Sequence, residues 1–200
     1  MIKRTSSGLP EKVIYCSECN LSNQNPTSTN EYFHTNDIIQ DINKIARIGQ
    51  VCIKQSDLMW LHGILLYRAL VSYLRTHPEI TFVNIVETGT ARGFSSLCMA
   101  KALYDEQRQG TIYTIDVLPH SVPIYWNCIR DESGKYTRSQ LYENESCFHL
   151  FDYIQCIEGP SIKQLSKLSL SRVHFAFLDA QHDYPNLNYE LNFTKQRQEK

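Results

Sequence analysis

The run NIVETGTARGFSSLCMAKAL, from Asn84 to Leu103, constrains the fold of this chain more than any other stretch. It begins apolar and β-prone, passes through a loop with glycines at positions 89 and 93, and continues with small and aliphatic residues at helical spacing. Gly89 permits a tight turn, and Gly93 lets a helix begin close to a strand. The run therefore predicts a strand, a ligand-receiving loop and a helix, in that order.

The same alternation of strand and helix patterns continues on both sides of this run. Helical spacing of isoleucines predicts a helix over 36–49, and a strongly apolar helix begins at Asp57 and ends before Pro78. Further strands are expected at 80–87, 111–116, 153–159 and 172–179, and further helices at 94–103, 161–169 and 183–196, with an irregular stretch at 117–151. Such alternation predicts an α/β fold: a doubly wound, Rossmann-like parallel sheet with a helical N-terminal extension.

The length and composition of the chain limit the kinds of molecule that it is expected to bind and the compartment in which it is expected. A length of 200 residues suits one core-bearing domain. A net charge of −1 gives no electrostatic reason to bind nucleic acid or an anionic membrane. No stretch approaches the ~20 uncharged apolar residues of a membrane span, and the start lacks the apolar core of a signal peptide. Seven cysteines, an odd number, fit reduced thiols and predict a cytoplasmic protein.

The first 35 residues are polar and rich in Ser, Asn and Thr, and we expect a leader with little regular structure before a main domain at 36–200. Cys16 and Cys19 have a spacing that supplies half of a zinc site. A second pair is missing, since the next cysteine, Cys52, stands alone, although His34 is a conceivable third ligand. We therefore expect no structural zinc here.

Two kinds of ligand compete for the loop after the first strand. Dinucleotides favour the spacing GxGxxG, which places a pyrophosphate on a helix N-terminus. Here the glycines follow GxxxG, the central position is Ala91, and an acid precedes the first glycine. The carboxylate of Glu87 would repel a pyrophosphate but suits a cationic ligand.

The stretch ETGTARGFSS, from Glu87 to Ser96, resembles the first motif of class I S-adenosylmethionine-dependent methyltransferases. Its form, E-T-G-x-x-x-G-x-S, is similar to that of small-molecule O-methyltransferases and of the macrocin or cephalosporin-tailoring type, and the resemblance extends over 57–191. It implies S-adenosylmethionine as cofactor. The cofactor-binding residues that it implies are Glu87, Thr88, Gly89, Thr90, Gly93, Ser95, Asp116, Gly159, Ser161 and Asp179.

Two later motifs support the resemblance. Asp116, at the end of the second strand, matches the family acid that holds both ribose hydroxyls, since two acceptor oxygens suit a vicinal diol. Gly159 and Ser161 fall where the family has a G-D-S loop near the adenine, with Pro160 in place of the acid. FLDAQHDY, from Phe177 to Tyr184, resembles the fourth-strand motif L-D-G-D-H-S-Y.

Several of these residues have a purely structural alternative. Glu87 is a candidate helix-terminal acid, and Asp116 is a candidate cap. Ser95 and Ser96 can cap the helix that follows the loop. Three separated motifs in the family's order, each at a strand end, favour the binding site.

Asp179 and His182 are the expected catalytic residues. In the cation-dependent O-methyltransferases that the chain resembles, an acid at the end of the fourth strand binds magnesium and a base follows three residues later. Asp179 would bind Mg²⁺, and His182 would accept the proton of the acceptor hydroxyl. In the alternative, Asp179 touches only the amino acid part of the cofactor and His182 caps a helix.

The resemblance also implies strands beyond the fourth, so we expect a C-terminally truncated domain in which the 200 residues alone turn over weakly. An apolar fourth strand at the sheet edge calls for a covering chain, which leaves a homo-oligomer open. The expected function is methylation of a hydroxyl on a small-molecule acceptor, a sugar or another metabolite. The alternative is a non-catalytic remnant that binds a nucleoside or serves as an interaction module.

Overall fold

The computed structural model describes residues 36–49 and 60–198, so the predictions for the leader, including Cys16 and Cys19, lie outside the described residues. The elements are α1 (Asn36–Gly49), α2 (Trp60–Thr76), β1 (Phe82–Thr88), α3 (Phe94–Asp105), β2 (Gln109–Asp116), η2 (Ile129–Glu132), η3 (Ser139–Leu141), η4 (Phe148–Tyr153), β3 (Ile154–Glu158), α4 (Ser161–Leu165), β4 (Phe175–Leu178) and α5 (Tyr184–Lys195). Each expected strand and helix in the described part is present, the helix at 36–49 with the expected ends and most others with shifted ends.

The four strands form one parallel sheet in the order β3-β2-β1-β4. The chain moves outward from β1 through β2 to β3 and then returns to pair β4 with the other side of β1. The strand order therefore reverses between β1 and β4, and ligands of open α/β sheets bind beyond the strand ends at such a point. The expected Rossmann-like α/β fold is confirmed.

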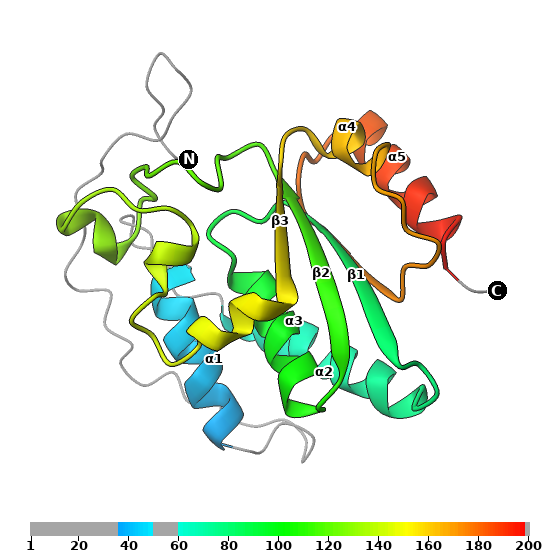
Figure 1. The fold of residues 1–200 in the computed structure, drawn as a ribbon, viewed down its shortest axis with the longest axis horizontal. Coiled ribbons are helices and arrows are strands. Elements are labelled where there is room, and N and C mark those ends of the chain that lie inside the picture. Colours follow the sequence, from blue (N-terminus) through cyan, green and yellow to red (C-terminus); the bar gives the residue numbers. More distant parts are fainter. Residues whose placement is uncertain (1–35, 50–59, 199–200) are drawn as a thin grey trace.

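Helices cover both faces of the sheet, with α1, α2 and α3 on one face and α4 and α5 on the other (Figure 1). Alternate strand residues divide between two clusters of buried side chains, because successive side chains of a strand point to opposite faces. Ile85 and Ile112 belong to the large cluster with α1–α3, whereas Val86 and Ile115 belong to a small cluster with α4 and α5. No described helix combines the length and apolarity of a membrane-spanning helix.

The segment between β2 and β3, residues 117–153, is irregular as expected, with three short 3₁₀ turns. It is nevertheless well packed. Trp126 and Tyr142 are buried in the large cluster, and Ile124 forms an isolated antiparallel bridge with Tyr136. This segment covers the α3 side of the sheet next to the loop that follows β1.

Candidate functional site

The loop after β1 depends on two glycines for different reasons. Gly89 has a φ of +90°, and a Cβ atom added there would lie 2.1 Å from the carbonyl oxygen of Asp179, at the end of β4. Gly93 has a φ of +94°, but a Cβ atom there would meet nothing within 4 Å. Gly89 therefore permits both the turn and the close approach of β1 to β4, whereas Gly93 supplies only a backbone conformation that L residues rarely adopt.

Glu87 lies behind this loop, with 0% of its surface exposed. Its carboxylate accepts hydrogen bonds from the hydroxyls of Ser95 and Ser96 in the first turn of α3, and from the hydroxyl of Thr114 in β2 at 2.6 Å. Burial raises the pKa of Glu87, and the three hydroxyls together with the nearby Arg138 guanidinium oppose that rise. Glu87 thus connects the end of β1 to both α3 and β2.

This arrangement changes the interpretation of two expected residues. Ser95 and Ser96 do not cap α3, since the helix begins after Gly93 without a side-chain cap, so the capping alternative was wrong. The Glu87 carboxylate is enclosed and already accepts three hydrogen bonds, so it is not placed as an exposed anion for a cationic ligand. Its contacts hold the base of the loop, and direct cofactor contact by Glu87 and Ser95 stays a prediction.

Asp116 is half-buried at the end of β2, and its carboxylate connects the loop to that strand. Its Oδ2 accepts the Ala91 N–H at 2.6 Å, and its Oδ1 accepts the Leu118 N–H at 2.8 Å. Ala91 has a φ of +46°, a left-handed conformation that costs an L residue about 1–2 kcal/mol. A carboxylate has about four acceptor sites, so two remain on Asp116 after these two bonds.

The side chains of Thr88 and Thr90 point to opposite sides of the sheet. Thr90 is buried and its hydroxyl lies 2.6 Å from that of Thr114, which donates its single hydrogen to Glu87. Thr90 therefore donates to Thr114, and both hydroxyls belong to the Glu87 network. On the other face the Thr88 hydroxyl donates to Oε2 of Glu190, a residue of α5 that is 1% exposed.

Sequence reasoning missed several members of this network. Thr114 carried a usable signal, because it lies two residues before Asp116 in a strand and so shares its face. The segment at 117–153, which covers this side of the sheet and is called the covering segment below, carried no such signal in its sequence. From it, the Tyr142 hydroxyl donates to the Arg92 carbonyl at 3.1 Å, and Nε of Arg138 donates to the Ala91 carbonyl at 2.8 Å.

Gly159 and Ser161 lie next to Asp116, as the resemblance implies. The Gly159 N–H donates to the Asp116 carbonyl at 2.7 Å, and the φ of Gly159 is +133°. Ser161 is buried at the first residue of the short helix α4. The structure therefore brings together the expected residues that end β1, β2 and β3.

Asp179 and His182 lie after β4 and are exposed. Oδ1 of Asp179 is 3.3 Å from Nε2 of His182, and the two side chains are 52% and 78% exposed. His182 does not cap α5, because that role belongs to Asp183, whose side chain accepts the Asn186 N–H at 2.9 Å. The helix-cap alternative for His182 was therefore wrong.

A metal site at Asp179 finds no support. Within 36–49 and 60–198, no group of three or more His, Cys, Asp or Glu side chains is placed to hold a metal ion. Magnesium is anchored by carboxylates or substrate oxygens, and the contact that Asp179 makes at 3.3 Å is with the imidazole of His182. These side chains therefore do not form the expected Mg²⁺ site.

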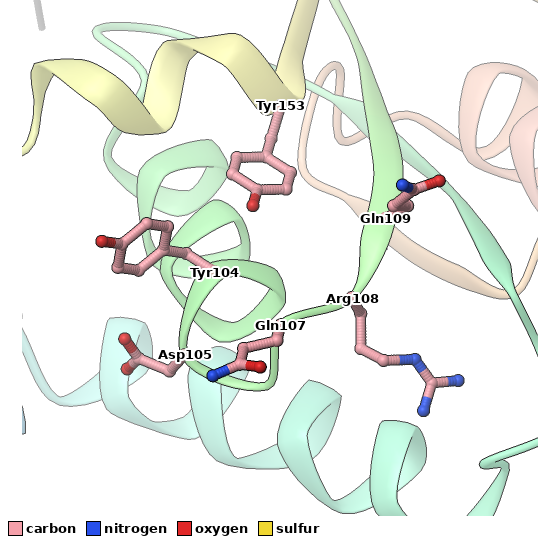
Figure 2. Close-up of a pocket in the computed structure, with 6 residues that line it drawn as sticks. All are labelled: Tyr104, Asp105, Gln107, Arg108, Gln109 and Tyr153. Atoms are coloured by element: carbon pink, nitrogen blue, oxygen red, sulfur yellow. The ribbon is translucent and has the colours of Figure 1, made fainter.

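A cavity of about 540 Å³ lies at the other end of α3, where the chain enters β2. Figure 2 shows that the rings of Tyr104 and Tyr153 line it from different elements, while the Arg108 side chain extends away from them. The Arg108 guanidinium donates to the carbonyls of Leu74 and His77 and so holds the end of α2. This cavity lies at the start of β2, whereas Asp116 ends that strand.

Comparison with known proteins agrees with the geometry. Residues 86–199 match the family described as Methyltransferase domain, and no curated protein matches the chain in sequence. Among solved structures, an O-methyltransferase from Bacillus cereus in complex with SAH is 14% identical, with a TM-score of 0.50 over 83% of this chain and 63% of that one. Cofactor-bound Rv0187 from MTB is 14% identical, with a TM-score of 0.50 over 80% of this chain and 62% of that one.

At these identities the two structures support the fold alone. The chain spans about three fifths of their length. The expectation of a C-terminal truncation is not borne out by the comparisons, and the family match runs to residue 199.

Proposed function

The chain belongs to the methyltransferase-domain family, and we propose that it transfers a methyl group from S-adenosylmethionine to a hydroxyl of a small molecule. The observation that carries this proposal is the loop between β1 and α3. It is fixed by Gly89 against the end of β4 and by Asp116 at the end of β2, at the carboxyl edge of the sheet where such folds bind ligands.

We propose that Asp116 binds the ribose. Each of its carboxylate oxygens already accepts one backbone N–H, from Ala91 and from Leu118. One acceptor site remains on each oxygen, which matches the two hydroxyls of a vicinal diol. The Thr88, Gly89, Thr90 and Gly93 backbone, with Gly159 and Ser161 beside Asp116, would surround the rest of the cofactor.

When bound, S-adenosylmethionine supplies an electrophilic methyl group on a sulfonium, so the chain has to position the acceptor and remove its proton. We assign proton removal to His182. If Nε2 carries the hydrogen that faces Asp179, then Nδ1 is free to take the hydroxyl proton. The Asp179 carboxylate stabilises the imidazolium that results. The deprotonated acceptor oxygen would then be the nucleophile for the methyl group, which would leave the sulfonium as S-adenosylhomocysteine is released.

The acceptor that we propose is a hydroxyl of a sugar or another small metabolite, and the reaction would take place in the cytoplasm. The alternative is a nucleoside-binding module without turnover. The exposure of Asp179 and His182 favours that alternative, because an acid–base pair usually works in a site closed to water.

The test is methyl transfer to a panel of hydroxyl acceptors, read as S-adenosylhomocysteine by mass spectrometry, with calorimetric titration of S-adenosylhomocysteine. We expect His182→Ala to lower kcat on the order of 10²–10⁴-fold without weakening that titration. His149→Ala, an exposed histidine in the covering segment, is the matched control and should keep full activity. Binding without turnover on any acceptor would support the nucleoside-binding module, and absence of binding would refute both.

A further inference from the structure

Arg138 makes an unusual contact with the loop that follows β1. It belongs to the covering segment at 117–153 and is 1% exposed. Its Nε donates to the Ala91 carbonyl at 2.8 Å, across 47 positions of sequence. Ala91 is the residue of the loop that adopts a left-handed backbone without being a glycine.

Both backbone polar groups of Ala91 are held by side chains from outside the loop. Asp116 accepts its N–H and Arg138 donates to its carbonyl. An alanine at positive φ persists only where its surroundings fix it, since the strain is otherwise released by rotation of the peptide units. Asp116 and Arg138 hold the two sides of this residue from two different elements.

The rest of the guanidinium group points to a role other than stability. Its Cζ lies 5.1 Å from the centre of the Trp126 ring, and its Nη2 is buried without a hydrogen-bond partner among the described residues. The nearby Glu87 carboxylate offsets part of the desolvation cost of this cation. The unsatisfied Nη2 donor still lowers stability, so the specific feature that Arg138 adds is its contact with Ala91. Trp126 is itself fixed, since its Nε1 donates to the Tyr136 carbonyl at 2.6 Å.

We propose that Arg138 is a positioning residue, which holds Ala91 in its left-handed conformation and so keeps the loop in its binding shape. The effect on cofactor affinity rests on the proposed function, whereas the effect on the loop itself does not. Arg138 touches neither of the expected catalytic residues, so its removal should act on binding of S-adenosylmethionine and leave the methyl-transfer step unchanged.

The experiment compares Arg138→Gln and Arg138→Lys with Arg130→Gln in the full 200-residue chain. Arg130 lies in the same segment and pairs with Glu145 at 3.0 Å, so its replacement changes the charge equally without touching the loop. Hydrogen exchange of a peptide covering 86–97 is measured without any ligand. In parallel, KM for S-adenosylmethionine, kcat and the affinity for S-adenosylhomocysteine are determined.

We expect exchange in the loop to be at least tenfold faster in Arg138→Gln than in the wild type, partly restored in Arg138→Lys, and within twofold of wild type in Arg130→Gln. KM for S-adenosylmethionine should rise at least tenfold in Arg138→Gln, with kcat within threefold. If Arg138→Gln does not fold, intermediate exchange in Arg138→Lys decides the question.

Loop exchange that is unchanged in both Arg138 variants would overturn the proposal, as would equal acceleration by Arg130→Gln. A wild-type chain that binds no S-adenosylhomocysteine would refute the proposed function instead. Faster loop exchange in Arg138→Gln would then still support the positioning role.

Discussion

The two strand ends that meet where the strand order reverses, those of β1 and β4, are built in opposite ways. After β1, Glu87 is fully buried and accepts three hydroxyl hydrogen bonds, and Ala91 has both backbone groups held. After β4, Asp179 and His182 are exposed and contact each other. The loop after β1 is therefore held by many contacts within the chain, whereas Asp179 and His182, the proposed acid–base pair, are held by few.

The largest effect should come from the point where the two ends touch. Gly89→Ala would combine strained backbone with overlap against the Asp179 carbonyl, at a total cost of about 4 kcal/mol in unfolding free energy. Gly93 also has a positive φ, but a Cβ atom there would meet open space. Gly93→Ala should therefore cost about 1–2 kcal/mol in unfolding free energy. Urea unfolding of both variants measures the difference, and equal costs would mean that the strand ends do not press on each other.

The next effect concerns the buried carboxylate and its pH dependence. Glu87→Gln should lower the unfolding free energy by about 1–2 kcal/mol, because the side-chain amide cannot accept hydrogen bonds from all three hydroxyls. Burial raises the pKa of Glu87 above its ordinary value of 4.5, so the folded chain disfavours the ionised form more than the unfolded chain does. The stability that this group adds is therefore full below pH 4.5 and is lost as pH rises through the folded pKa.

Thermal unfolding of wild type and Glu87→Gln across about pH 4 to 8 isolates this contribution. The difference in Tm between the two proteins should be largest at the acidic end and should narrow as pH rises. A difference that widens with pH would show that the three hydroxyls outweigh burial and that the pKa of Glu87 is lowered.

A smaller effect, of opposite sign, is expected at Ala91. Replacement by glycine removes the backbone strain at a φ of +46°, but it also gives the unfolded chain more conformational freedom. The unfolding free energy should therefore rise by a net amount of about 0.5 kcal/mol. Ala91→Gly should therefore raise the urea midpoint slightly. It should also lessen the effect of Arg138→Gln on loop exchange, because a glycine needs less support to keep this conformation. A loss of stability would indicate that Ala91 is not strained.

The smallest effect belongs to the β4 end. His182→Gln should change the unfolding free energy by less than about 0.5 kcal/mol, because the side chain is 78% exposed and pairs with an exposed acid. The same variant should lose methyl transfer if His182 is the base. Circular dichroism and the transfer assay on one preparation check both statements. A clear loss of stability would place His182 in a packed contact.

The sequence predicted the alternating elements and the strand-end positions of Glu87, Asp116 and Asp179, because strand and helix periods and glycine spacing are local properties of the chain. It did not predict how the Glu87 carboxylate is used. Its partner Thr114 lies 27 residues away in β2, where a threonine is an ordinary strand residue.

The role of Arg138 was likewise beyond local reasoning. It lies in an irregular segment without periodicity, and its contact with Ala91 depends on how that segment folds back over α3. The exposure of Asp179 and His182 could not be predicted either, since their spacing is the same whether or not a neighbouring chain covers them.

The division of the core into two unequal clusters has a consequence for how the molecule opens. The cluster on the α4–α5 face comprises five buried residues within the described part: Val86, Ile115, Leu165, Val173 and Phe193. The opposite cluster includes most of α3 and reaches into the covering segment. Free energies of partial unfolding follow the apolar area that each unit buries, so β4 with α5 should detach as a unit while the rest stays folded. A protease would then cut first around 179–183, so the proposed acid–base pair would be lost before the loop that follows β1.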